Sequence, residues 1–152
     1  MSRAEPKGSG PYWVVTPEGR VVAPRVRRAD SLQARFFGLM GRASLADGEG
    51  LWLEPSSGIH MFFMRIAIDA AFVDRAGRVL RVCHDLRPWR LGRFLVVPGS
   101  RATIEVAAGT LGAAGVRPGD QLRLIPATQP AAARIAAIPH PLTDATLPGG
   151  SS

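Results

Sequence analysis

The sequence predicts one mainly β domain, an antiparallel sandwich or a closed barrel with one short helix near residues 31–38. Short apolar stretches recur between residues 11 and 126. Turn motifs such as Thr16–Gly19 and Asp74–Gly77 separate them at roughly the 8–12-residue spacing of such folds. The length of 152 residues suits a single domain with its own core.

Composition divides the chain into three parts. Residues 1–10 are polar and rich in Gly, Ser and Pro, so we expect a disordered extension. Residues 11–126 form the predicted β domain. Residues 127–152 are rich in Ala and Pro and predict a mobile tail.

The first strands are expected at 12–16 and 20–23. Because Pro24 has no N–H, the second strand either lies at a sheet edge or continues past a break at this proline. A helix is predicted at 31–38 because Asp30 can cap its free amides and Gln33 stands three residues on. One helical turn is expected within 109–115. Further strands are predicted at 51–53, 59–64, 66–73, 79–82, 94–97, 103–106 and 121–125. Residues 103–106 alternate polar and apolar side chains, which is typical of a half-exposed strand.

The stretch 59–69 is a long apolar run that contains three ionisable residues, His60, Arg65 and Asp69. A run this apolar is expected to be buried, and buried ionisable groups need partners. Either the fold satisfies these groups internally or they line a pocket.

Net charge and cysteine content limit the partners and the compartment. The formal charge is +7, and seven arginines but only one acidic residue, Asp85, fall within 75–101. The chain has 18 arginines and one lysine, which indicates a chain-wide bias, so nucleic acid is not the partner we expect. A single cysteine, Cys83, excludes an internal disulfide. With no signal-like or membrane-spanning stretch, we expect a cytoplasmic monomer without membrane attachment.

Several motifs in order resemble a known family. Arg35, Gly38-Leu39-Met40 and Arg42 form an Arg-x-x-Gly-Leu-Met-x-Arg pattern. After it come Ile59–Arg65, Ile68-Asp69, Phe72–Asp74, Pro88–Arg90, Ile104–Gly109 and Gly119-Asp120. Together these resemble the family called domain of unknown function 192, from about Val21 to Leu124. The resemblance implies a compact, mainly β domain and little about activity. The chain departs from the family in having Ala67 where many members have proline.

His60 and Asp69 could be metal ligands or an acid–base pair, with a third ligand from Asp74, His84 or Asp85. The structural alternative is a core histidine bonded to a backbone carbonyl, with Asp69 capping a turn or pairing with Arg65.

Two other segments carry alternatives of the same kind. Gly38–Arg42 could bind an anion, or Arg42 could bridge to Glu49 or Asp47. Trp89 beside Arg87 and Arg90 suits stacking on a base or sugar, or a tryptophan folded back over the end of the domain.

We therefore predict a binding or accessory module without catalysis, for an anionic or carbohydrate-like ligand, and no metal or other cofactor is called for. The predicted ligand-binding residues are His60, Arg65, Asp69, Arg87, Trp89 and Arg90. One alternative is a metal-assisted hydrolase that uses His60, Asp69 and Asp74. The other is nonspecific nucleic-acid binding through segment 75–101.

Overall fold

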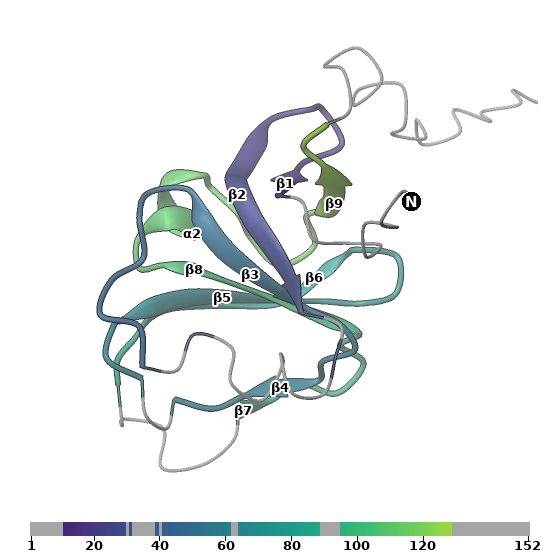
Figure 1. The fold of residues 1–152 in the computed structure, drawn as a ribbon. Helices are drawn as coiled ribbons and strands as arrows, with labels where there is room; N and C mark the ends of the chain where they lie inside the picture. The colour runs from purple at the N-terminus through teal and green to yellow at the C-terminus, as the bar shows by residue number, and fades with distance from the viewer. Residues whose placement is uncertain are drawn as a thin grey trace, which may run out of the picture.

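The computed structural model describes residues 11–29, 31, 39, 41–61, 64–88 and 95–128 (Figure 1). The predicted helix at 31–38, apart from Ser31, and Trp89 and Arg90 lie outside these residues. So do the N-terminal extension and the tail from residue 129. Within the described ranges, no helix is long and apolar enough to cross a membrane.

A mixed seven-stranded sheet forms the body of the domain, in the order β6-β5-β8-β3-β2-β1-β9. Strands β2 and β3 are parallel, and the other neighbours in this sheet are antiparallel. A small antiparallel sheet pairs β4 with β7, and a short helix, α2, follows β8. The bounds are β1 (Tyr12–Val15), β2 (Val21–Ala29), β3 (Glu49–Leu53), β4 (Gly58–Ile59), β5 (Ile68–Val73), β6 (Val79–Leu86), β7 (Leu95–Val96), β8 (Ala102–Ala107), α2 (Thr110–Ala113) and β9 (Arg123–Pro126).

The predicted mainly β class is confirmed in its sandwich-like form, and the sheet is not a closed barrel. Its two edges nevertheless approach one another. Arg78, just before β6, forms an antiparallel bridge with Gln121, just before β9. Backbone hydrogen bonds of 2.8 Å join Leu122 N to Gly77 O and Val79 N to Asp120 O. The large sheet is therefore strongly curved and encloses side chains on its inner face.

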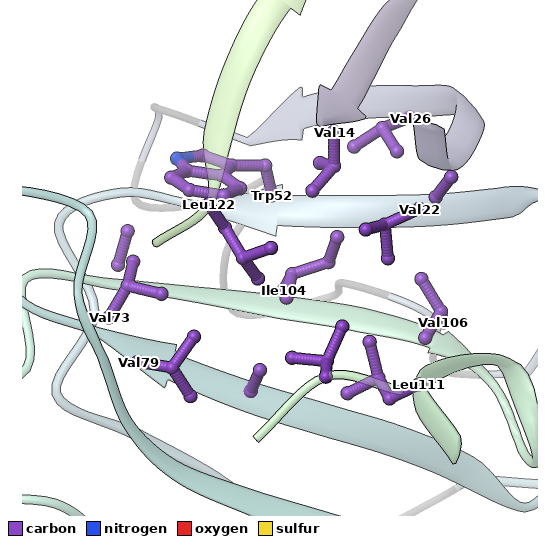
Figure 2. Packing of buried hydrophobic residues seen from close by; sticks show 14 residues of the cluster. Val14, Val22, Val26, Trp52, Val73, Val79, Ile104, Val106, Leu111 and Leu122 are labelled. Atoms are coloured by element: carbon purple, nitrogen blue, oxygen red, sulfur yellow. The ribbon is translucent and has the colours of Figure 1, made fainter. Parts of the chain in front are cut away.

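The inner face carries the first hydrophobic cluster, which runs the length of the curved sheet (Figure 2). Alternation along β8 sends Ile104 and Val106 into this cluster and sends Thr103 and Glu105 to the opposite face. Trp52 and Leu122 lie toward one end of the cluster, and Leu111 of α2 lies toward the other. The helix thus covers one end of the enclosed core, and it does not cover the opposite end, at which Trp52 lies.

The outer face is covered by the layer that contains β4 and β7, below the large sheet in Figure 1. Ile59 and Val97 from this layer pack against Ala70 and Phe72 of β5. Farther along, the buried residues Leu39, Met61 and Met64 pack with Leu51, Leu53, Ile68 and Ala29. Every residue of β5 is buried because it has packed side chains on both faces.

Three local predictions need correction or qualification. Strand β2 continues through Pro24 to Ala29, and its pairing with β1 is irregular between Ala23 and Val26. The missing N–H of Pro24 falls in that irregularity, as the sequence allowed. The strand predicted at 59–64 is wrong at His60, Met61 and Met64, although Met61 and Met64 are buried as expected, and residues 62 and 63 lie outside the described ranges.

The prediction of a half-exposed strand at 103–106 is also wrong. Residues 102–106 of β8 are all buried, because the strand lies between β3 and β5 and the second layer covers its outer face. The polar residues Thr103 and Glu105 point toward that layer rather than toward solvent.

Replacing Gly77 with alanine should destabilise the closure between the two sheet edges. Gly77 has φ +83°, and an added Cβ would lie 2.4 Å from the carbonyl oxygen of Leu122. Left-handed strain costs about 1–2 kcal/mol, and the backbone clash adds to it. Gly119→Ala is the matched control, because Gly119 has φ +93° with open space around it. Urea unfolding should show a larger loss for Gly77→Ala, and equal losses would contradict the clash.

Candidate functional site

Four of the six residues predicted to bind a ligand lie within the described part of the chain. His60 is half-buried directly after β4, and Arg65 is exposed. Asp69 of β5 is completely buried. Arg87 is exposed, and its Nε lies 3.0 Å from Oδ2 of Asp85. The ligand-binding role of these residues stays a prediction.

Asp69 anchors backbone from three elements. Its Oδ1 accepts a hydrogen bond from the N–H of Asp85 in β6, at 3.0 Å. Its Oδ2 accepts hydrogen bonds from the N–H groups of Gly109 and Leu111, each at 3.0 Å. Gly109 is the N-cap of α2 and offers no capping side chain, so a carboxylate from β5 satisfies the first free amides of the helix. The expectation that Asp69 caps a turn agrees with this geometry, and within the described ranges Asp69 has no hydrogen bond or ion pair with Arg65.

His84 lies beside this buried carboxylate. Its Nδ1 is 3.6 Å from Oδ2 of Asp69, and the imidazole is 53% exposed. The neighbouring Cys83 packs against the second layer instead. The two side chains therefore face apart, as strand alternation predicts, and do not form a thiolate–imidazole pair.

The geometry gives the hydrolase alternative no converging ligands. Asp69 and Asp74 stand at opposite ends of β5, roughly 16 Å apart along a strand. Asp74 Oδ1 instead accepts hydrogen bonds from Ala76 N at 2.8 Å and Arg78 N at 2.9 Å within its turn. Across the described parts of the chain, no three His, Cys, Asp or Glu side chains are grouped so as to hold a metal ion.

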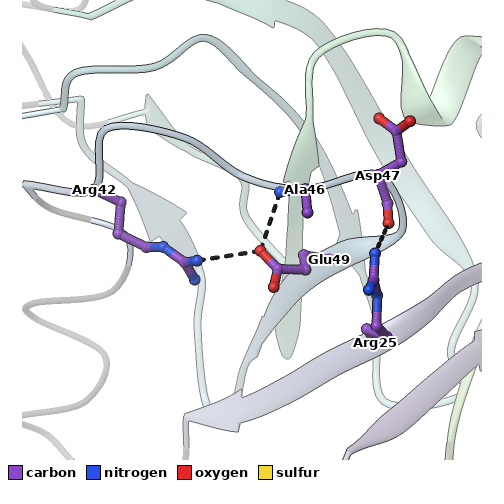
Figure 3. Close-up of polar contacts among 5 residues, drawn as sticks. All are labelled: Arg25, Arg42, Ala46, Asp47 and Glu49. Atoms are coloured by element: carbon purple, nitrogen blue, oxygen red, sulfur yellow. Dashed lines mark hydrogen bonds and ion pairs between the residues drawn. The ribbon is translucent and has the colours of Figure 1, made fainter.

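Arg42 has a structural role, which is one of the two alternatives raised by the sequence (Figure 3). Its Nη2 lies 3.1 Å from Oε2 of Glu49, and the same oxygen accepts a hydrogen bond of 3.1 Å from Ala46 N. The Ala46 N–H, and secondarily the Arg42 charge, lower the pKa of Glu49. Arg25 donates to the backbone oxygen of Asp47 in the same network. These contacts fix the loop that leads into β3.

Glu105 is the residue that sequence reasoning misjudged most. It lies in the middle of β8, paired with Leu51 of β3 and Ala70 of β5, and only 6% of it is exposed. Burial raises the pKa of its carboxyl group to about 7. Among the described residues, its side chain has no hydrogen bond or ion pair. A glutamate within a run of apolar residues could have indicated burial, but the alternation of polar and apolar residues along the strand predicted that Glu105 faces solvent.

A cleft of about 540 Å³ opens at the end of the curved sheet opposite α2. Its walls come from the ends of β2 and β3, the turn after β5, the starts of β1 and β8, and β9. Trp52 and Tyr12 line it together with Leu122 and Leu124, and the turn Asp74–Gly77 forms one rim. Ligand sites are commonly found at such openings and have volumes of about 300–1,000 Å³.

Among the described residues, four arginines and two carboxylates line the cleft, an excess of two positive charges: Arg28, Arg75, Arg101, Arg123, Glu54 and Asp74. Both carboxylates are already engaged. Glu54 Oε2 accepts from Trp52 Nε1 at 3.1 Å and lies 3.8 Å from Arg28 Nη2, and Asp74 binds the amides of its own turn.

Two arginines, Arg75 and Arg101, are exposed, and no hydrogen bond or ion pair of their side chains occurs within the described ranges. Arg101 is held at this corner because its backbone N–H donates to Val73 O at 2.7 Å, two residues before Arg75. The sequence could not single these two out among its many arginines, because their proximity depends on the pairing of β5 with β8.

Comparisons with known proteins agree with one another. The model of the family DUF192, described as an uncharacterised ACR, matches residues 13–124. The UPF0127 protein of Thermococcus sibiricus is 31% identical over 110 residues, which cover 69% of each chain. A crystal structure of a protein of unknown function from Novosphingobium aromaticivorans shares the fold, with a TM-score of 0.66 and 24% identity, over 81% of this chain and 92% of that one.

A second crystal structure, of a provisionally assigned transcription regulator from Sinorhizobium meliloti, has a TM-score of 0.65 and 23% identity, and covers 74% of this chain and 91% of that one. At these identities the two structures show the fold alone. The family match spans most of the chain and includes the strands that carry Asp69, Glu105 and most of the cleft. The chain therefore belongs to the uncharacterised DUF192 family.

Proposed function

We propose that this protein is a binding module for a small anionic ligand, and that the ligand occupies the cleft between β9 and the turn Asp74–Gly77. The observation that carries the proposal is the state of the charges around the cleft. Both lining carboxylates are engaged, whereas Arg75 and Arg101 have guanidinium groups uncommitted within the described chain. Guanidinium groups form paired, charge-assisted hydrogen bonds with oxyanions, so this corner suits an anion.

The side chains that line the cleft support binding rather than catalysis. Arginine stays protonated in proteins and does not serve as a general acid or base near neutral pH. The described lining contains no histidine, cysteine or serine that could act as a base or nucleophile. Aromatic and apolar side chains lie beside the charges, which is the usual composition of a small-molecule site.

The double substitution Arg75→Gln and Arg101→Gln tests the proposal. Isothermal titration calorimetry with inorganic phosphate and with citrate, at low ionic strength, should show binding to the wild-type protein. The double variant should bind at least about tenfold more weakly, because it loses two charge-assisted contacts. Added salt should weaken the wild-type binding.

Arg117→Gln is the matched control, since Arg117 is exposed and does not line the cleft. It removes one positive charge and should leave the affinity nearly unchanged. Thermal unfolding of all three proteins should be alike, because the side chains of Arg75 and Arg101 have no hydrogen bond or ion pair in the described chain. Absence of binding by either anion, or equal binding by the double variant, overturns the proposal.

A further inference from the structure

The walls of the cleft differ in chemistry from one side to the other. Arg75 and Arg101 form a charged corner at the end of β5. Another wall comes from β1 and β9, which contribute Tyr12, Leu124 and Pro126 together with Arg123. Trp52 lies deeper, nearly buried, and its hydrogen bond to Glu54 fixes the orientation of the indole. A ligand that uses the whole cleft therefore needs an anionic end and an apolar end.

The charge at the corner matches a dianion better than a monoanion. The described lining has an excess of two positive charges, and Arg75 and Arg101, whose guanidinium groups have no hydrogen bond or ion pair within it, are on adjacent elements. A phosphate monoester carries about −1.5 to −2 at neutral pH and presents three acceptor oxygens. A carboxylate carries one charge and two oxygens, so it would leave one guanidinium without an anionic partner.

The size of the cleft argues for more than a phosphate group. About 540 Å³ is typical of sites for whole small molecules. Phosphate at the arginine corner alone would leave Tyr12, Leu124 and Pro126 in contact with water. Tyr12 is partly exposed at that wall, and its ring offers a flat surface for stacking.

We infer that the ligand belongs to the phosphate monoesters whose esterified body is a flat, apolar ring, with the phosphate between Arg75 and Arg101 and the ring against Tyr12. This inference rests on the proposed anion-binding function of the same cleft. It adds the charge of the anion and the nature of the body attached to it.

Calorimetry with three probes tests the inference at pH 7.5 and low ionic strength. Phenyl phosphate has both the dianion and the ring, inorganic phosphate lacks the ring, and benzoate has the ring with a single charge. Phenyl phosphate should bind at least about tenfold more tightly than either of the others, because inorganic phosphate lacks the stacking contact and benzoate lacks the second charge. Lowering the pH from 7.5 to 5 should weaken phenyl phosphate, whose second pKa is about 6, and leave benzoate nearly unaffected.

Tyr12→Leu separates the ring contact from the charge contact and keeps an apolar residue in β1. This variant should lose several-fold in affinity for phenyl phosphate and keep the affinity for inorganic phosphate. Thermal unfolding establishes that it is folded.

Each outcome decides a different statement. If benzoate binds as tightly as phenyl phosphate, the dianion is wrong and the anion-binding function stands. If inorganic phosphate binds as tightly as phenyl phosphate, or Tyr12→Leu changes nothing, the ring is wrong. If none of the probes binds, the proposed function fails together with the inference.

Discussion

Asp69→Ala is expected to lower the free energy of unfolding by about 3–5 kcal/mol. The substitution removes the acceptor of three backbone N–H groups, those of Asp85, Gly109 and Leu111. A buried donor without an acceptor costs about 1–3 kcal/mol, and the bond to Leu111 lies in the buried interior. Two of the three donors are only partly buried and can reach water, which keeps the total below the sum of three full penalties.

Urea unfolding followed by circular dichroism measures this loss. Asp120→Ala is the matched control, because Asp120 also accepts a backbone hydrogen bond, from Arg117 N at 2.8 Å, but at an exposed site. The control should lose less than about 1 kcal/mol. Hydrogen exchange at the Leu111 amide should accelerate in Asp69→Ala and stay slow in the control. A loss for Asp69→Ala as small as that of Asp120→Ala would show that the carboxylate does not hold α2 in place.

Glu105→Gln is expected to stabilise the protein at alkaline pH and to change little near pH 4.5. Burial raises the pKa of Glu105 from 4.5 to about 7 in the folded chain. As the pH rises above 4.5, the unfolded chain releases this proton first, so ionisation favours unfolding. The stability of the wild type therefore falls between about pH 4.5 and 7 and levels off above that range. The shift corresponds to about 3 kcal/mol, which glutamine avoids because it carries no charge.

Unfolding of both proteins at several values between pH 4.5 and 8.5 checks the prediction. The difference between variant and wild type should grow with pH, which separates this site from groups that both proteins share. Glu49→Gln is the control with the opposite sign. The Ala46 N–H lowers the pKa of Glu49 below 4.5, so its charge favours folding, and its loss should destabilise the protein throughout this pH range. A pH-independent difference for Glu105→Gln would contradict an uncharged, buried carboxyl group.

The sequence predicted those features that depend on local patterns. The turns Thr16–Gly19 and Asp74–Gly77 and the helical turn after Gly109 follow from residue types at fixed spacing, and the structure has all three. The mainly β class followed in turn. Opposite orientations of Cys83 and His84 needed only strand alternation.

Features that depend on which strands lie side by side could not be predicted. The burial of Glu105 requires that β8 lie between β3 and β5 and that a second layer cover it. Alternation alone cannot distinguish a strand with one wet face from a strand covered twice. Similarly, Asp69 meets Gly109 and Leu111 only because β5 pairs with β8. The corner formed by Arg75 and Arg101 has the same origin.

Pairing of β1 with β9 also has a kinetic consequence. Tyr12 lies opposite Pro126, so one wall of the cleft joins an early strand to the last strand described. During synthesis, β1 cannot pair with β9 until nearly the whole domain has been made. Such distant pairing slows folding, because the entropy of closing the intervening loop is lost before the contact forms. A nascent chain halted before β9 would lack the wall proposed to hold the ring of a ligand, even if the other strands of the sheet had already paired.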